Sequence, residues 1–326
     1  MARADLIVNL VKASVIGDQQ GARSVTEAIV AEERAMQHTV LAERLEQVLR
    51  INQPRASGSG LNGRHPAKDY LYDLSPQCRL ADLTLPPVVA TACRRLVDEQ
   101  LSASVLRANG LDPRHRVLLV GPPGNGKTSV AEALAEAMAV PFLVVRYEML
   151  VGSFLGETAG RLKRVFEYAR TLPCVLFFDE FDAVGKERGD AHETGEIKRV
   201  VASLLMQMDD LPAHTVLIAA SNHPELLDRA TWRRFQLRLS LPAPTPRLLE
   251  SYLTTFLTSL DEPAGMAAKT MTKHLGAISF AEVEEFTLDI RRQCVLAHGK
   301  RTLKAVVKDV LEQWRERKQA VADQQL

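Results

Sequence analysis

Apolar stretches of two kinds alternate along the middle of this 326-residue chain. Short, almost continuous apolar runs are typical of strands that are buried on both faces of a parallel sheet. Between them lie longer stretches with apolar residues three and four positions apart, which predict amphipathic helices. The expected strands cover residues 116–120, 142–146, 174–178, 215–220 and 236–241. Strands and helices in this order predict a doubly wound α/β sheet over residues 70–245.

The flanking regions have helical patterns only. Residues 1–52 predict two or three helices, a unit that is marginal alone and is expected to dock a partner or substrate. Residues 53–69 are rich in Gly, Ser and Pro, which predicts a flexible linker or, alternatively, an ordered surface loop. Residues 246–326 predict a helical lid, with helices near 247–259, 270–275, 281–298 and 304–321.

Composition and charge narrow the class of protein. The formal net charge of +1 argues against a strong global attraction to nucleic acid, although it leaves room for a local basic patch. The four cysteines lack C-x-x-C spacing, so neither a zinc site nor a disulfide framework is expected. Charged residues interrupt the apolar start of the chain, and no run reaches the length of a membrane span. We therefore expect a cytoplasmic protein without a membrane partner.

Residues 116–128, RVLLVGPPGNGKT, contain the pattern G-x-x-x-x-G-K-[ST] between an expected strand and an expected helix. Glycines allow several backbone N–H groups to point at phosphates, and the positive end of the helix dipole adds to this. A chance match in a Gly/Pro turn is the alternative, but strand and helix both stand where the motif needs them. The expected ATP-binding residues are Gly121, Pro122, Pro123, Gly124, Asn125, Gly126, Lys127, Thr128 and Ser129.

A second motif, the strand PCVLFF followed by Asp179 and Glu180, completes the chemistry of phosphoryl transfer. Open α/β sheets bind ligands at the carboxyl ends of their strands, where these acids lie. Lys127 is expected on the β- and γ-phosphates, and Thr128 and Asp179 are the expected ligands of Mg²⁺. Glu180 is expected to orient the attacking water. An acidic pair alone is often only a turn, so the hypothesis depends on both motifs together.

These motifs resemble the AAA+ ATPases, and in particular the substrate-remodelling branch that includes katanin, spastin and the proteasomal ATPases. The resemblance covers roughly residues 75–300, and the chain looks like a compact bacterial member of this branch. It implies a P-loop NTPase fold with a helical lid, Mg²⁺-dependent ATP hydrolysis, and a homo-oligomeric ring that is usually a hexamer. The family's second sensor has no arginine counterpart near residues 276–282, so no residue of the lid is assigned to catalysis.

Three further segments resemble working parts of that family. Residues 151–158 resemble its first pore loop, in which Phe154 and Leu155 would grip an extended polypeptide and Gly156 would give mobility; the alternative is that Phe154 is an ordinary core residue. Residues 185–196 have the position of the second pore loop or are simply a solvated loop. Asn222 has the place of the polar sensor beside the γ-phosphate, with a turn cap as the alternative.

Residues 227–235, LDRATWRRF, resemble the segment from which arginine fingers reach a neighbouring subunit's nucleotide. A planar guanidinium suits this task because it contacts developing phosphate charge through several donors. The family's Pro-Gly between the two arginines is missing here, so the finger is either Arg233, the first choice, or Arg234.

The resemblance implies a ring that pulls on, unfolds or disassembles a protein substrate. The chain has no H-E-x-x-H motif, so any proteolysis needs a separate effector, and compact relatives beside a subtilisin-like protease suggest antiphage defence as one setting. One alternative is a nucleic-acid motor or loader, since residues 291–318 carry nine Lys/Arg against three Asp/Glu. The other is a nucleotide-dependent scaffold with little turnover.

Overall fold

The structure is a computed structural model. It describes Leu6 and residues 25–26, 28–30, 66–150, 155–182, 194–260, 262–297 and 301–323. The chain divides into two compact units, Met1–Gly63 and Arg64–Leu326, and the division falls within the glycine-rich segment 53–69. In the first unit, residues 28–30 are helical and Val30 is buried. The domain boundaries after residues 52, 69 and 245 stay predictions.

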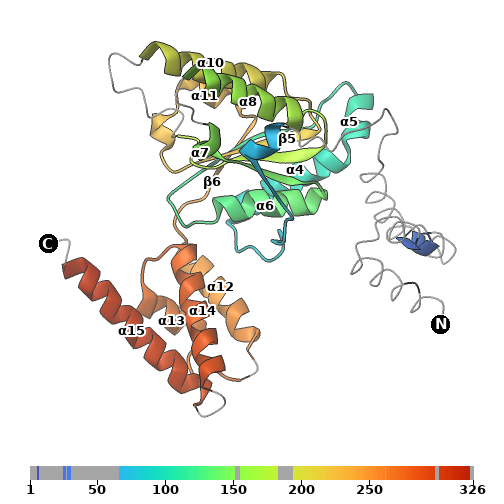
Figure 1. The fold of residues 1–326 in the computed structure, drawn as a ribbon. Coiled ribbons are helices and arrows are strands. Elements are labelled where there is room, and N and C mark those ends of the chain that lie inside the picture. Colours follow the sequence, from blue (N-terminus) through green and yellow to red (C-terminus); the bar gives the residue numbers. More distant parts are fainter. Residues whose placement is uncertain are drawn as a thin grey trace. The chain divides into compact units, whose positions relative to one another are not determined.

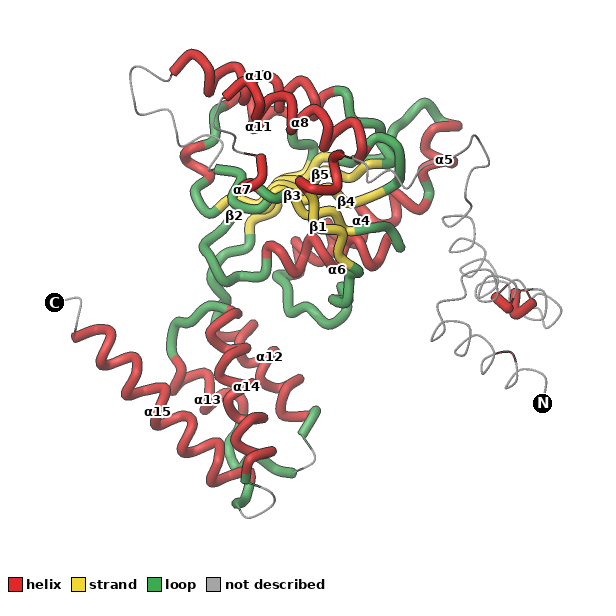
Figure 2. The backbone as a smooth tube through the Cα atoms, viewed as in Figure 1, coloured by secondary structure: helices red, strands yellow, loops and turns green. Residues whose placement is uncertain are grey.

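The second unit is built on a six-stranded sheet with the order β1-β3-β4-β5-β2-β6 (Figure 2). Its strands are β1 (Leu71–Leu74), β2 (Arg116–Val120), β3 (Phe142–Val145), β4 (Cys174–Phe178), β5 (Thr215–Ser221) and β6 (Leu237–Ser240). Strands β2 to β6 are parallel, and β1 runs antiparallel to β3 at the edge. The predicted α/β fold is confirmed, and β1 is an addition that the sequence pattern did not predict.

Helices cover both faces of this sheet (Figure 1). The helical elements of this region are η1 (Pro66–Tyr70), α4 (Pro87–Leu101), α5 (Ala103–Ala108), α6 (Lys127–Met138), α7 (Tyr147–Leu150), α8 (Leu155–Ala169), α10 (Thr194–Asp209), η3 (Pro224–Leu226) and α11 (Arg229–Arg234). Alternate residues of β2 face opposite layers: Leu118 packs in the cluster with α8 and α10, whereas Leu119 packs in the cluster with α4 and α6. The carboxyl ends of the parallel strands lie side by side, between these two packed layers of helices.

The C-terminal helices form a separate core of their own. They are α12 (Pro246–Thr258), α13 (Ala268–Leu275), α14 (Phe280–Leu296) and α15 (Leu303–Asp323). Leu253, Phe286 and Val307 are buried in this core. Helix α12 begins at Pro246 with the Thr245 hydroxyl as its N-cap, and Ser279 and Glu282 form a capping box at the start of α14. The helical lid expected after the sheet is thus present.

Two predicted substrate segments reach beyond the described residues. Phe154 and residues 183–193 lie outside them, so the pore-loop hypotheses for these positions stay predictions. Leu155 and Gly156 form the start of helix α8. Within the described part of the chain, no helix combines the length and apolar character that crossing a bilayer requires.

Candidate nucleotide site

The loop between β2 and α6 has the backbone that its glycines predict. Gly121 has a φ of +151°, and a Cβ at this position would collide with the carbonyl oxygen of Leu241. Gly126 has a φ of +80° and precedes the first residue of α6, where no described side chain caps the helix. The first-turn N–H groups of α6 therefore keep their capacity to bind an anion.

Lys127 is almost buried, with 7% of its surface exposed, and points back into this loop. Its ammonium donates hydrogen bonds to the carbonyl oxygens of Gly121 at 2.7 Å and Pro122 at 3.0 Å, and to Oδ1 of Asn222 at 2.6 Å. Burial lowers the pKa of Lys127, and the negative charges of Asp179 and Asp182 partly offset that effect. The loop thus places the positively charged ammonium of Lys127 at the carboxyl ends of the parallel strands.

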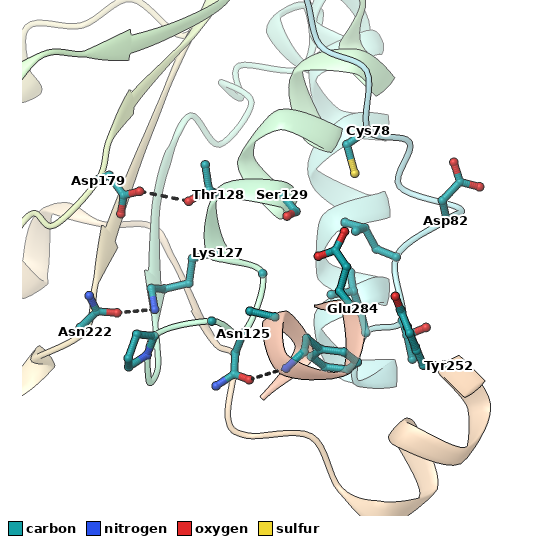
Figure 3. A pocket seen from close by; sticks show the side chains of 18 of the residues that line it. Cys78, Asp82, Asn125, Lys127, Thr128, Ser129, Asp179, Asn222, Tyr252 and Glu284 are labelled. Atoms are coloured by element: carbon teal, nitrogen blue, oxygen red, sulfur yellow. Dashed lines mark hydrogen bonds between the residues drawn. The ribbon is translucent and has the colours of Figure 1, made fainter. Parts of the chain in front are cut away.

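Two hard oxygen ligands lie together beside the lysine (Figure 3). The Thr128 hydroxyl donates a hydrogen bond of 3.0 Å to Oδ2 of Asp179, which follows strand β4. Mg²⁺ prefers oxygen ligands and commonly takes one or two from the protein, keeping the rest for water and phosphate. An adjacent hydroxyl and carboxylate at the phosphate-binding loop match this preference, so the donor set fits Mg²⁺.

Glu180 and Asn222 follow neighbouring strands and face the same cavity. Glu180 is exposed and has a φ of +45°, which is uncommon for a residue with a side chain. Its backbone N–H donates to Oδ1 of Asp179 at 2.9 Å. Asn222 is half-buried and offers its amide oxygen to Lys127. The Glu180 carboxylate, the Asn222 amide and the Lys127 ammonium therefore belong to residues that line the same cavity.

The cavity has a volume of about 570 Å³, and residues from the lid and from the segment before α4 form part of its lining. In Figure 3, Lys127, Thr128 and Asp179 lie on one side, and Tyr252 and Glu284 lie on the other. The lid contacts the phosphate-binding loop directly. Ala281 donates its N–H to the Gly124 carbonyl at 2.9 Å, and Phe280 donates its N–H to Oδ1 of Asn125 at 3.4 Å.

The two candidate arginine fingers lie at the amino ends of the parallel strands, whereas this cavity lies at their carboxyl ends. They precede β6, whose first residue pairs in parallel with Val117, whereas the phosphate-binding loop begins after the last residue of β2. Five strand residues at about 3.3 Å each cover roughly 16 Å. Arg234 donates its Nε to Asp209 at 2.9 Å, and Asp209 also pairs with Arg116 at 3.1 Å, at the start of β2. Arg233 is exposed and has no hydrogen bond or ion pair with the described residues.

The structure therefore gathers some of the predicted site residues and separates others. Those that line one cavity are Pro123, Gly124, Asn125, Gly126, Lys127, Thr128, Ser129, Asp179, Glu180 and Asn222. The carbonyl oxygens of Gly121 and Pro122 accept hydrogen bonds from Lys127. Arg233 and Arg234 lie apart from the cavity, before the start of β6. Sequence reasoning missed the buried Asp182, although the run D-E-F-D carried an acidic signal. It also missed Tyr252 and Glu284, which have no such signal.

Comparison with known proteins yields a family and several relatives. Residues 117–243 match the family described as "ATPase family associated with various cellular activities (AAA)". The chain is 35% identical over 290 residues to the AAA family ATPase y4kL of Sinorhizobium fredii, covering 87% of each protein. It is 38% identical over 191 residues to the ATP-dependent zinc metalloprotease FtsH of Acidothermus cellulolyticus, and 37% identical over 149 residues to the peroxisomal ATPase pex6 of Schizosaccharomyces pombe. These matches cover 56% and 44% of this chain but only 28% of FtsH and 16% of pex6.

Proposed function

We propose that this chain, which belongs to the AAA family of ATPases and hydrolyses ATP, uses hydrolysis to remodel a protein substrate within a ring of copies of itself. The observation that carries the proposal is the separation of the arginine pair from the cavity of the same chain. Arg233 and Arg234 precede β6, at the amino ends of the parallel strands, and Lys127 lies at their carboxyl ends. A guanidinium at this place serves phosphoryl transfer only when a second copy brings its nucleotide to it.

In this proposal each group of the cavity has one task. Lys127 and the N–H groups of the loop hold the phosphates of ATP, and Thr128 and Asp179 hold Mg²⁺. When bound, the ion neutralises charge that develops on the phosphate oxygens. Glu180 orients the attacking water and accepts its proton, and Asn222 fixes the same water beside the γ-phosphate. Because catalysis of phosphoryl transfer is mostly positioning, the protein has to supply little further chemistry.

The family relationship supports a protein substrate. FtsH is by name an ATP-dependent metalloprotease, whereas this sequence carries no H-E-x-x-H motif. We therefore propose that the chain works in the cytoplasm as an unfoldase, as a hexamer, and that a separate effector such as a protease performs any cleavage. Phe154, Leu155 and Gly156 are proposed to grip the substrate, with residues 1–52 as the docking unit for partner or substrate. A role in antiphage defence is the setting that such an effector would suggest.

The lid gives little support to the alternative of a nucleic-acid motor. Several of its basic residues form ion pairs with acidic residues of the lid. Arg292 pairs with Glu285 at 2.7 Å and Asp289 at 3.0 Å, and Arg317 also pairs with Asp289, at 3.5 Å. Arg301 with Asp309, and Lys308 with Glu312, form further pairs. Paired charges contribute less to phosphate binding than free ones, because binding would first have to break the pairs.

A stimulation assay on the purified full-length chain separates the three functions. ATP turnover is measured alone, with a fluorescent protein bearing an unstructured tail, and with single- and double-stranded DNA, while native mass measurements follow assembly with ATP. We expect rings, faster turnover with the tailed protein, and loss of its fluorescence. Stimulation by DNA alone would establish the nucleic-acid motor instead. Binding of ATP with negligible turnover under all conditions would establish the scaffold.

A further inference from the structure

Asp182 is the only buried carboxylate among the residues whose side chains the structure describes, with 5% of its surface exposed. It lies in the turn after β4, three residues beyond Asp179, and does not line the nucleotide cavity. A buried charge is costly to the fold unless several hydrogen bonds compensate for its lost hydration. The partners of Asp182 therefore indicate what its position achieves.

Those partners are consecutive residues at the end of β5. Oδ1 of Asp182 accepts hydrogen bonds from the Ser221 hydroxyl at 2.9 Å and from the backbone N–H of Asn222 at 3.1 Å. The Ser221 oxygen in turn accepts the N–H of His223 at 3.1 Å. One carboxylate thus fixes the backbone from which the Asn222 side chain reaches Lys127.

The same turn carries Glu180 in a strained backbone conformation. Left-handed residues other than glycine persist only where the surrounding structure holds them. Immediately after Glu180, Phe181 donates its N–H to the carbonyl of Ala220 at 2.8 Å, and Asp182 then accepts hydrogen bonds from Ser221, the last residue of β5, and from Asn222 directly after it. The turn after β4 is therefore tied to the end of β5 by three consecutive contacts.

We propose that Asp182 is a positioning residue for ATP hydrolysis, which fixes Glu180 and Asn222 relative to each other at the γ-phosphate. This inference rests on the roles proposed above for Glu180 and Asn222. Asp182 does not line the nucleotide cavity, and its negative charge acts on Lys127 without a hydrogen bond between the two side chains. Its main effect is therefore on the chemical step, with only a small effect on ATP binding. Misplacing a catalytic group by about 1 Å is enough to slow a reaction by about 100-fold.

The test compares Asp182→Ala with a control at the start of β5, the strand whose last residue contacts Asp182. Thr215 is fully buried at the start of β5 and donates its hydroxyl to the Ala169 carbonyl at 3.0 Å. Thr215→Val removes one buried hydrogen bond far from the cavity. Turnover is expressed per nucleotide bound, with the number of sites counted by titration with a fluorescent ATP analogue, so that unfolded chains do not contribute.

For Asp182→Ala we expect turnover per bound nucleotide to fall by about 10- to 100-fold, with the ATP affinity changed by less than about threefold. Asp182→Asn keeps an oxygen acceptor and should recover most of the turnover. Thr215→Val should lower thermal stability without this loss. If Asp182→Ala does not fold, Ser221→Ala removes one of the two donors and should give a smaller loss with the same signature.

The double variant Asp182→Ala/Asn222→Ala provides the decisive comparison. If Asp182 acts through Asn222, the loss in turnover should be smaller than the product of the two single losses. A loss equal to that product, or unchanged turnover per site in Asp182→Ala, would overturn the inference. If Asn222→Ala and Glu180→Gln themselves keep full turnover, the proposed roles in the cavity fail instead.

Discussion

The ammonium of Lys127 and the amide oxygen of Asn222 lie 2.6 Å apart, although 95 positions separate the two residues in the sequence. Together with the carbonyl oxygens of Gly121 and Pro122, Asn222 occupies all three donors of the ammonium. A phosphate oxygen that binds Lys127 therefore competes with Asn222 for the same proton donor. The two residues are coupled, so removing the Asn222 amide should lower turnover without weakening ATP binding, whereas a carboxylate in its place should weaken ATP binding.

Asn222→Ala removes the competing acceptor and the proposed contact to the attacking water. We expect ATP affinity to be unchanged or higher and turnover to fall by at least about tenfold. Asn222→Asp places a carboxylate beside Lys127 and should weaken ATP binding by about tenfold, or about 1.4 kcal/mol. Titration with a fluorescent ATP analogue and phosphate-release assays measure the two effects. Equal affinities in both variants would contradict the competition.

Lys127→Ala and Glu180→Gln should separate binding from hydrolysis. Lys127 is a buried cation whose loss removes a charged hydrogen bond to phosphate, worth about 1.5–3 kcal/mol, so ATP affinity should fall by about 10- to 100-fold. Glu180 is exposed at the cavity and contacts no phosphate in the proposed arrangement, so Glu180→Gln should bind ATP normally and lose about 100-fold in turnover. Full turnover in Glu180→Gln would remove its assignment as the base.

The parts of this site that the sequence predicts are those whose chemistry is written in consecutive residues. The loop around Lys127 needs glycines, a lysine and a hydroxyl at fixed spacing, and the strand before Asp179 needs an unbroken apolar run. Both are local requirements, so the pattern identifies them directly. The same holds for strands β2 to β5, whose residues are mostly buried on both faces.

Other features depend on contacts between distant parts of the chain. Asp182 owes its partners to Ser221 and Asn222, about forty positions away, and an acid after Asp179 and Glu180 gives no sign of being buried. Strand β1 has four residues with only Leu71 buried, so it lacks the alternation that predicts a strand. Contacts of the lid with Gly124 are made by backbone groups, which any residue provides.

Arg233 and Arg234 should differ in what their removal does. Arg233→Ala removes an exposed side chain and should leave thermal stability unchanged, while turnover falls by about 1,000-fold in a complete ring of variants. Arg234→Ala breaks the partly exposed pair with Asp209 and should cost up to about 1 kcal/mol in stability. Mixing Arg233→Ala with wild-type subunits should lower turnover by more than simple dilution. Strictly proportional loss in mixtures would exclude action on a neighbouring subunit.

His115 should make the fold less stable in mild acid. The residue is buried at 8% exposure, and burial lowers its pKa below the ordinary value of 6.5. Below about pH 6.5 the unfolded chain therefore binds a proton that the folded chain does not, so stability falls as the pH falls, by at most about 1.4 kcal/mol per pH unit. The Arg114 side chain lowers the pKa of Glu99, so that carboxyl titrates below this window.

Substituting His115 by glutamine tests this origin. Thermal unfolding of wild type and His115→Gln between pH 7 and pH 5 should show a flatter dependence in the variant, because the titrating group is gone. An identical slope in both proteins would assign the acid sensitivity to other groups.

Phe154→Ala tests whether the ring grips a protein substrate. We expect thermal stability and basal ATP turnover close to those of wild type, because the proposed loop position lies outside the core and away from the nucleotide. Removing a buried aromatic ring from a core would instead cost about 3–5 kcal/mol in the free energy of unfolding.

Fully buried Phe166, in the cluster between α8 and the sheet, provides the matched control: Phe166→Ala should melt far below wild type. Remodelling of a tailed fluorescent protein should be abolished in Phe154→Ala. Early melting of that variant would make Phe154 a core residue, whereas normal stability with normal remodelling would show that this loop does not hold the substrate.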